Sequence, residues 1–438
     1  MNYHKYLNTE SNKYSFFLSI LASAFFASFI SPQIALKGRG LRLSLVLLML
    51  LLGFVFLVKP RAYLSWSRHR ITLVLGFIYV INGIVRYLID PEITLFQNLI
   101  ISALVCVIIS MVVLVIREGF KNYVESIRWL TLIILGISLG MGIPILLNTP
   151  QVARLTMGNP LEDYYASLLY PKGVANYSWY TPVAIAFPVI ANWIYRNVKD
   201  RIRKVISWGL LLAVSIATLL SSFMMASILL VIAAFVWLLL VAVKAKKKAA
   251  RVYAIVIIAI IIFSLPTVFL IGADFQPTKF VIDKASKITE NIRIYGLIQA
   301  DETGRTEMLI RTINTFINSP ILGGWGIDSN FYIGGHSSWG DILGSQGLVG
   351  LLLWIGFIYP SFKRNNKWLS IEDGSAGGTL SWILLFIGGV LNPTLHSSIA
   401  LILIWLFDDG TAWIKKRQLN VVESAAVKNK AYAVSILY

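Results

Sequence analysis

The sequence predicts an all-α integral membrane protein, a single polytopic domain over residues 1–438 with about twelve transmembrane helices. The 438 residues are 57% hydrophobic and 14% charged, whereas soluble domains hold about 45–50% apolar and about 25% charged residues. The apolar residues also gather in long runs, and a helix that spans a bilayer needs about 20 of them. These two observations exclude a soluble enzyme, a disordered chain and a coiled coil.

The predicted spans are apolar runs bounded by charged or turn residues. One run, 205–243, is about twice the length of a span, so Ser221-Ser222 near its middle predicts a tight turn between two helices. The last three runs are short, and their helices are expected to extend into flanking small and polar residues. The first run has no small-x-small cleavage site before a soluble domain, so it is not interpreted as a signal peptide. The runs are 16–30, 43–58, 71–89, 95–116, 129–147, 181–195, 205–243 (two helices), 252–271, 348–359, 379–391 and 397–407.

The net charge of +18 fits either nucleic-acid binding or the loop bias of a polytopic membrane protein. If both termini lie on one side, that side carries 27 of the 39 Lys and Arg residues, and the opposite side carries 11. Cytoplasmic loops carry such an excess, so the predicted topology is N-in and C-in, with 409–438 as a cytoplasmic tail. Basic clusters such as Lys244 to Lys248 are then orientation signals, and no nucleic-acid partner is expected.

Two predicted outer loops are long, and long loops in a compact fold are usually functional or disordered. The first loop, 148–180, holds five tyrosines, among them Tyr164 and Tyr165. The second loop, 272–347, lies between the ninth and tenth spans and is expected to carry short amphipathic helices. Function is therefore expected on the extracytoplasmic side, mainly in the second loop.

One helix of this loop is predicted over 306–318. On a helical wheel Arg305 shares its direction with an apolar stripe that includes Leu309 and Thr312, whereas Arg311 falls on the polar face. An arginine directed toward a membrane bundle needs a partner. Arg305 therefore either snorkels or pairs with a carboxylate, or it binds a phosphate with its guanidinium fork. For Arg311 the solvated interpretation is favoured.

Two histidines lie on the predicted outer side. Ser338 and Asp341 have the spacing of a capping box, which places His336 just before a helix N-terminus. There it can act as a general base or make a polar contact at the cap. His396, in the turn between the last two spans, is favoured as a structural residue. Arg86, near the outer end of the third span, either snorkels or contacts a phosphate.

No cofactor and no metal are expected. The single cysteine, Cys106, lies in an apolar run and excludes an intrachain disulfide. No two histidines have the spacing of helical zinc ligands, and Asp90-Pro91-Glu92 in a short loop has no further ligand near it.

The chain resembles the O-antigen ligase / O-antigen polymerase family of bacterial envelope polysaccharide enzymes. The specific part covers 304–350, and the twelve spans and the late outer loop agree with the family over the whole chain. Two positions depart from the family, because Ser337 follows the histidine where asparagine is usual, and Ser221-Ser222-Phe223 has no arginine where many members carry Ser-Arg. The residues that carry the resemblance are Gly304-Arg305, Pro320, Gly323, Gly326, His336, Gly344, Gly347 and Gly350.

The resemblance implies a metal-independent glycosyltransferase of the inner (cytoplasmic) membrane with its active site on the extracytoplasmic side. The donor is a glycan on undecaprenyl diphosphate, and the acceptor is a second lipid-linked glycan in a polymerase or lipid A-core in a ligase. The resemblance assigns Arg305 to the diphosphate and His336 to acceptor activation or diphosphate contact. Further binding candidates are Arg86, Arg293, Arg311, His396, Tyr164 and Tyr165.

The expected function is polymerisation of lipid-linked repeat units into a cell-surface polysaccharide, which is an O-antigen, a capsule or an exopolysaccharide. A polymerase is preferred because the two departures weaken the match to ligases, and a ligase is the alternative. A lipid-linked oligosaccharide flippase or exporter is the alternative from another class, and it would need polar residues deep in many spans. Besides the lipid bilayer, a chain-length regulator is an expected partner.

Overall fold

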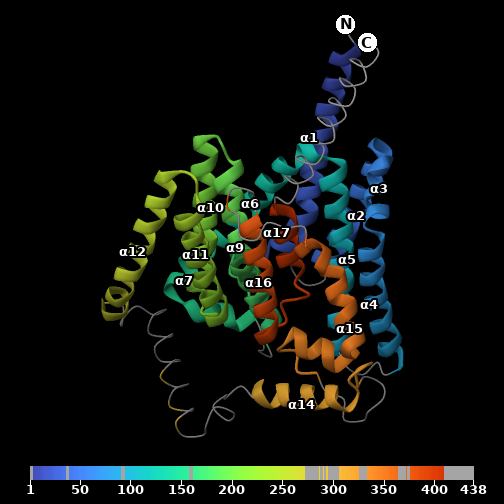
Figure 1. Ribbon diagram of the computed structural model, residues 1–438, viewed down its shortest axis with the longest axis vertical. Coiled ribbons are helices and arrows are strands. Elements are labelled where there is room, and N and C mark those ends of the chain that lie inside the picture. Colours follow the sequence, from blue (N-terminus) through green and yellow to red (C-terminus); the bar gives the residue numbers. More distant parts are fainter. Residues whose placement is uncertain are drawn as a thin grey trace, which may run out of the picture.

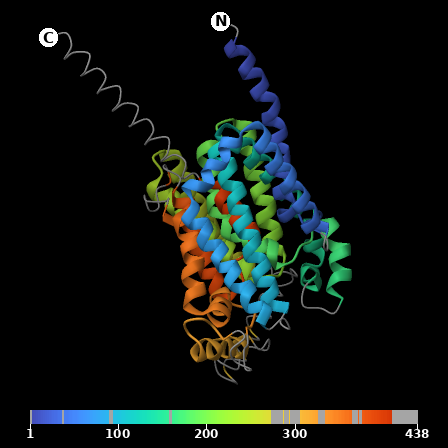
Figure 2. The ribbon, with the colours of Figure 1, turned by 90° about the vertical axis from the view of Figure 1, so that its right-hand side faces the viewer.

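The computed structural model describes residues 3–35, 39–89, 94–156, 161–271, 286, 290, 293, 305–324, 333–363, 371 and 375–408. These residues form helices and connecting turns, and no β-strand occurs among them. Most long helices run side by side along one axis of an elongated bundle (Figures 1 and 2). The predicted all-α class is confirmed.

Short helices connect some of the long helices of the bundle, and turns connect others. The long helices are α1 (Tyr3–Ile30), α2 (Arg39–Val58), α4 (Arg70–Ile89), α5 (Thr94–Gly119), α6 (Val124–Gly140), α9 (Tyr177–Asn197), α10 (Arg201–Leu220), α11 (Met224–Lys244), α12 (Lys248–Ile271), α15 (Ser338–Lys363) and α16 (Ser375–Leu391). The shorter ones are η1 (Pro60–Tyr63), α3 (Leu64–Arg68), η2 (Lys121–Tyr123), α7 (Ile143–Asn148), η3 (Pro150–Thr156), α8 (Glu162–Leu169), η4 (Tyr170–Lys172), α14 (Arg305–Asn318) and α17 (Ser398–Phe407).

Six segments among the described residues are helices long and apolar enough to cross a membrane, or seven if the bent pair 42–58 and 60–67 is one span. These apolar helices suggest a membrane-embedded protein. The predicted count of twelve spans is not confirmed. Helix α17 has 10 residues and α16 has 17, fewer than the roughly 20 that a span needs, and α9 carries Pro182 and Pro188 inside it.

The long apolar run 205–243 is divided where the sequence predicts a turn. Helix α10 ends at Leu220 and α11 begins at Met224. Between them Ser222 adopts a left-handed φ of 55°, which no residue inside a right-handed helix can adopt. The Ser222 hydroxyl donates to the carbonyl of Pro150 in η3. The predicted pair of helices is therefore confirmed, and its turn is held by a hydrogen bond to η3.

Both segments predicted as long outer loops contain helices. The first contains η3, α8 and η4, and the second contains α14, which matches the predicted helix over 306–318. Helix α14 lies across one end of the bundle (Figures 1 and 2). Its buried side chains are Thr312 and Thr315, whereas Leu309 is 41% exposed. Thr312 and Leu309 of the predicted apolar stripe thus both lie beside α15, next to Gly344 and Gly340, but Leu309 is only partly covered.

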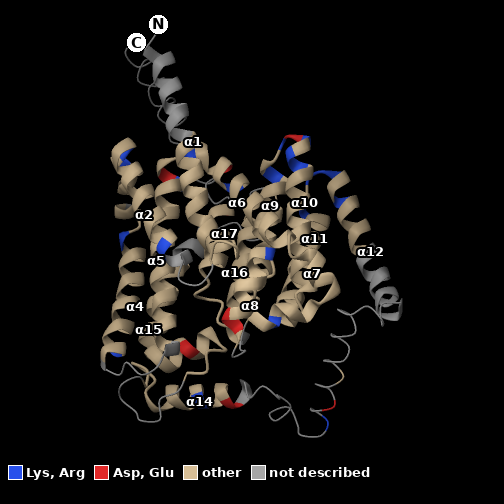
Figure 3. Cartoon of the chain, turned by 180° about the vertical axis from the view of Figure 1, so that it is seen from behind, with Lys and Arg blue, Asp and Glu red and all other residues tan. Residues whose placement is uncertain are grey.

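Basic residues gather at one end of the bundle. The connections from α9 to α10 and from α11 to α12 lie at that end, and α14 lies at the other (Figure 3). This separation agrees with the predicted division of charge between two sides. It gives the molecule a basic end and an end that carries α14.

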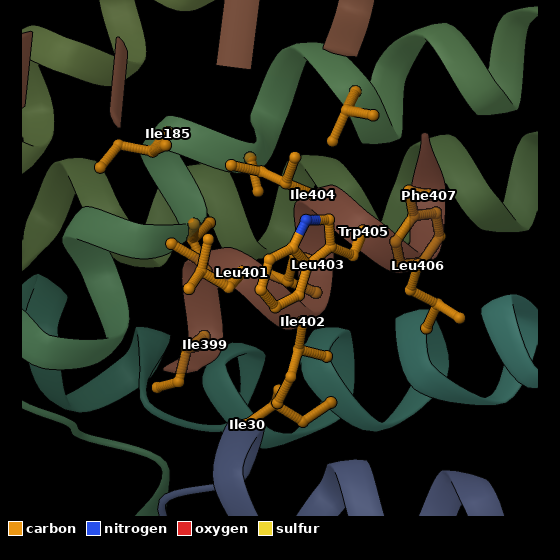
Figure 4. Packing of buried hydrophobic residues seen from close by; sticks show 14 of the residues in the cluster. Ile30, Ile185, Ile399, Leu401, Ile402, Leu403, Ile404, Trp405, Leu406 and Phe407 are labelled. Atoms are coloured by element: carbon orange, nitrogen blue, oxygen red, sulfur yellow. The ribbon is translucent and has the colours of Figure 1, made fainter. Parts of the chain in front are cut away.

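Helix α17 is short and lies wholly inside the bundle. Every residue from Ile399 to Phe407 is buried, and the helix packs against α5, α9 and α16. Side chains such as Ile185 of α9 and Ile30 of α1 lie in the same cluster (Figure 4). Since α17 ends inside the protein, its terminal backbone groups need partners other than water.

Two buried arginines supply these partners at the C-terminal end of α17. Arg117 of α5 donates from Nη1 to the carbonyl of Trp405 at 2.7 Å and from Nη2 to that of Asp408 at 2.6 Å. Arg128 of α6 donates from Nε to the carbonyl of Leu406 at 2.7 Å and from Nη2 to that of Asp408 at 3.1 Å. A cation at a helix C-terminus also interacts favourably with the helix dipole.

Replacing Arg117 by alanine is expected to lower the free energy of unfolding by roughly 3 kcal/mol, because buried carbonyls lose their donors. The midpoint of thermal unfolding of the purified protein in detergent measures this effect. Arg201→Ala, at an exposed arginine of the basic end, is the matched control and should change the midpoint little. Equal midpoints for the two variants would contradict the role of Arg117.

Candidate functional site

A cavity of about 370 Å³ lies between the starts of four helices. Its walls come from 98–102 of α5, 177–182 of α9, the segment before α15 together with Asp341, and the connection 393–399 between α16 and α17. Helix α15 starts near α14 (Figure 1), so the cavity lies toward the end of the bundle that carries α14. Its volume falls in the usual range of ligand pockets, roughly 300–1,000 Å³.

Polar side chains cap three of the helices that start at the cavity. Asn176 accepts from the Ser178 N–H of α9 at 2.9 Å. Ser397 accepts from the Ala400 N–H of α17 at 3.3 Å, and Ser337 accepts from the Gly340 N–H of α15 at 3.2 Å. Helix N-termini carry partial positive charge, and these caps already use some of the N–H groups that an anion would otherwise bind.

The start of α15 corrects the predicted capping box. Ser337, rather than Ser338, caps the helix. The Ser338 hydroxyl donates to the carbonyl of Asn392 at 3.2 Å and accepts from the Leu395 N–H at 3.0 Å. Ser338 therefore fastens the start of α15 to the connection between α16 and α17. The sequence pattern favours Ser338 because Asp341 stands three residues after it, but in the fold the Asp341 carboxylate accepts from the Gly335 N–H instead.

Asp341 is the buried carboxylate of the cavity, whereas the sequence pattern predicts only a capping role for it. Its side chain is 2% exposed and lines the cavity. Its Oδ1 accepts from the Gly335 N–H at 3.0 Å. Gly335 adopts a φ of 68°, a left-handed conformation that favours glycine. A buried carboxylate held by backbone N–H groups and a helix N-terminus can stay charged without a lysine or arginine.

His396 also lines the cavity, in the connection between α16 and α17. Its Nε2 lies 3.1 Å from the Tyr79 hydroxyl, and its ring stacks on Tyr79 and lies 4.2 Å from that of Trp354. Its carbonyl accepts from the Cys106 thiol at 3.3 Å. Burial lowers the pKa of His396 to about 3, so this imidazole is neutral near pH 7. These contacts agree with the favoured structural interpretation, although the ring also forms part of the cavity wall.

The structure places His336 beside the cavity. It is half-buried and stands between Gly335, which lines the cavity, and Ser337, which caps α15. Arg305 is the first residue of α14, and its side chain lies outside the described part of the structure. Arg311 is exposed and forms an ion pair with Glu307 at 2.6 Å, in agreement with the favoured solvated interpretation.

Arg86 lies in a second polar cluster, where α4 packs against α15. Its Nε donates to Asn82 Oδ1 at 3.3 Å, and its Nη1 lies 3.5 Å from the carbonyl of Gly323. Asn82 in turn donates to Gln346 Oε1 of α15 at 2.7 Å. Arg86 is 7% exposed, so it joins α4 to the turn after α14 instead of snorkelling.

The glycine progression that carries the family resemblance has a structural reason. Backbone hydrogen bonds dock the turn after α14 on α15, from Gly324 N–H to the carbonyl of Gly344 at 2.9 Å and from Leu348 N–H to that of Pro320 at 2.9 Å. Gly323 and Gly347 adopt φ values of 80° and 63°. A Cβ on Gly347 would collide with the carbonyl of Ile321. The crossing therefore needs glycines whatever chemistry occurs nearby.

The other candidates lie apart from these clusters. Tyr164 and Tyr165 are on α8, with ring centroids 5.7 Å apart, and Tyr164 is 60% exposed. Arg293 is exposed, and its neighbours in sequence lie outside the described residues. Asp90 and Glu92 lie outside them too, as does Gly304. Within the described part of the chain, no group of three or more His, Cys, Asp or Glu side chains could hold a metal ion.

Comparison with known proteins does not identify the chain. No family model matches it, and a search of curated proteins finds no match either. The family resemblance therefore depends on the residues in 304–350 and on the order of the apolar runs.

Replacing Gly347 by alanine is expected to destabilise the protein by about 3 kcal/mol or more. The alanine Cβ would collide with the carbonyl of Ile321, and alanine is also strained at the positive φ of this position. Gly209→Ala is the matched control, since a Cβ there meets no atom within 4 Å and alanine favours a helix interior by up to about 1 kcal/mol. Thermal unfolding of both purified variants measures the difference. A Gly347→Ala protein as stable as Gly209→Ala would contradict the close crossing.

Acidification is expected to destabilise the protein through His396. Its folded pKa of about 3 lies below the ordinary 6.5, so from pH 6.5 down to pH 3 only the unfolded state takes up the proton. This contribution to stability is complete above pH 6.5 and falls by about 2 kcal/mol between pH 7 and pH 5. His396→Gln should remove that part of the pH dependence and keep the wild-type slope between pH 7 and pH 9. Parallel stability curves for the two proteins from pH 7 to pH 5 would contradict this assignment.

Proposed function

We propose that this protein is a polysaccharide polymerase of the bacterial inner membrane that joins undecaprenyl-diphosphate-linked repeat units on the extracytoplasmic side. The observation that carries the proposal is the cavity at the α14 end of the bundle, with the buried carboxylate of Asp341 on its wall and His336 beside it. This cavity lies next to the segment that resembles the O-antigen ligase / O-antigen polymerase family. The end of the bundle opposite to it carries the basic connections, as expected for a cytoplasmic side.

The proposed reaction is one glycosyl transfer. The acceptor hydroxyl oxygen forms a bond to the anomeric carbon of the donor, and the bond from that carbon to the diphosphate oxygen breaks. Undecaprenyl diphosphate leaves with the electron pair, and a base at the site takes the hydroxyl proton. Asp341 is the proposed base, because it is a buried carboxylate on the cavity wall with backbone donors only among its described partners.

The remaining candidates take supporting roles in this proposal. Arg305, at the start of α14, and His336 contact the leaving diphosphate, whose charge grows as the bond breaks. Arg86 holds the turn after α14 against α4 and thereby positions that end of the site. His396 forms the cavity wall as a neutral imidazole. The product is an O-antigen, capsule or exopolysaccharide, and a chain-length regulator is a proposed partner in the bilayer.

A ligase that transfers the glycan to lipid A-core is the second candidate, because the same chemistry serves either acceptor. A flippase or exporter is the candidate of another class. Arg117 and Arg128, two buried arginines outside the site, bind the backbone of α17. Their charges therefore have a structural role and give no support to a transport path.

Replacing Asp341 by asparagine is expected to lower polymer formation at least 100-fold, the usual contribution of a general base. Arg305→Ala and His336→Ala are expected to lower it as well. The measurement is the length of surface glycan in a deletion strain that expresses each variant at the wild-type protein level. Asp200→Asn is the matched control, since asparagine caps a helix as well as aspartate does and Asp200 caps α10 at the basic end.

Surface glycan of normal length in all three variants would contradict the proposed enzymatic function. The phenotype of the deletion itself separates the two enzyme candidates. Single repeats on the acceptor indicate a lost polymerase, whereas long chains left on the lipid carrier indicate a lost ligase.

A further inference from the structure

The cavity has a charge that limits which part of a substrate it can hold. Its described lining includes one carboxylate, Asp341, several hydroxyls and the amide of Asn98, and it includes no lysine or arginine. A diphosphate carries at least two negative charges, and like charges repel strongly where water is scarce. At three of the four helix N-termini, which could offset this repulsion, one N–H is already bonded to Asn176, Ser337 or Ser397.

The same lining suits an uncharged sugar. A sugar hydroxyl both donates and accepts, and serine, threonine and asparagine side chains can pair with either function. The carboxylate of Asp341 only accepts, so it fixes the direction of one sugar hydroxyl. Tyr177, Pro182 and Pro393 add apolar surface for the C–H face of a ring. About 370 Å³ gives room for a short glycan end and not for a lipid chain.

We propose that this cavity is a binding site for the neutral, non-reducing end of the acceptor glycan, and that the site excludes the donor diphosphate by charge. The term acceptor rests on the proposed glycosyl transfer, whereas the selectivity for an uncharged carbohydrate does not. The diphosphate then binds outside the cavity, on the side of α14 where Arg305 begins the helix. The leaving diphosphate and the acceptor hydroxyl thus lie in two electrostatically different surroundings on either side of the donor's anomeric carbon.

A cysteine reporter in the cavity tests this charge selectivity directly. Ser102 lines the cavity and is partly exposed, and the chain has one native cysteine, Cys106, which is buried. Ser102→Cys is made in a Cys106→Ala background and treated in detergent at pH 8 with uncharged methyl methanethiosulfonate or with the anionic sulfonatoethyl methanethiosulfonate. The two labelling rates are then compared before and after Asp341→Asn.

The uncharged reagent is expected to react at least tenfold faster than the anionic one, relative to their rates on an exposed control cysteine at Ser167 of α8. Asp341→Asn should raise the anionic rate at least tenfold and leave the uncharged rate unchanged. Three outcomes would each overturn the proposal. The two reagents could react at equal relative rates in the parent protein, the rate of the anionic reagent could stay unchanged after Asp341→Asn, or neither reagent could label the Ser102→Cys thiol.

A protection experiment tests the ligand class. Neutral methyl glycosides of common envelope sugars, including glucose, galactose and N-acetylglucosamine, should slow labelling of the Ser102→Cys thiol, and inorganic pyrophosphate should not. Protection by pyrophosphate, or by none of the glycosides, would contradict a neutral sugar site. The two proposals can fail separately. If the cavity shows charge selectivity and glycoside protection but the Arg305→Ala and His336→Ala variants still make long chains, the neutral sugar site stands and only the proposed transfer mechanism is contradicted.

Discussion

The burial of the C-terminal end of α17 is the constraint on which the rest of the structure depends. Because this end of the helix lies inside the bundle, its terminal carbonyls need protein partners instead of water. Arg117 and Arg128 satisfy the C-terminal end, and the Ser397 hydroxyl satisfies part of the N-terminal end. Because the helix is fixed at both ends, the connection before it is fixed as well. That connection carries His396 and forms one wall of the cavity.

A second constraint fixes the opposite wall. The start of α15 is fastened to the connection before α17 by Ser338, and nine residues later α15 breaks at Gly347, where the turn after α14 crosses it. Arg86 and Asn82 of α4 bind this crossing from the other side. The placement of α14, and of Arg305 at its first position, is therefore set by backbone contacts at glycines. The side chains of α14 add to this contact through the buried Thr312 and Thr315, whereas residues such as Ile317 are largely exposed.

Local signals in the sequence were sufficient for some of these features and not for others. The turn at Ser221-Ser222 and the helix over 306–318 follow from chain-length limits and periodicity, and the structure confirms both. Arg117 and Arg128 belong to the 27 basic residues counted on the predicted cytoplasmic side, because a count of charges does not show which of them contact a helix end 278 to 291 residues later in the chain. Asp341 was assigned to a cap for a similar reason, since only the fold brings it beside α5, α9 and α17. Short α17 was expected to extend, because the sequence does not show that arginines satisfy its end.

The two constraints together separate charge within a small region of the protein. The wall set by α17 and the start of α15 presents a carboxylate, hydroxyls and a neutral imidazole, whereas Arg86 lies on α4 and Arg305 is the first residue of α14. The proposed transfer from a diphosphate to a hydroxyl needs both kinds of surface, because the base must stay unpaired while the leaving group must be neutralised. A cation on the cavity wall would pair with Asp341 and weaken this proposed base. The glycine crossing between α14 and α15 keeps the two surfaces adjacent and distinct, which is a physical reason for a glycine-rich junction at this position.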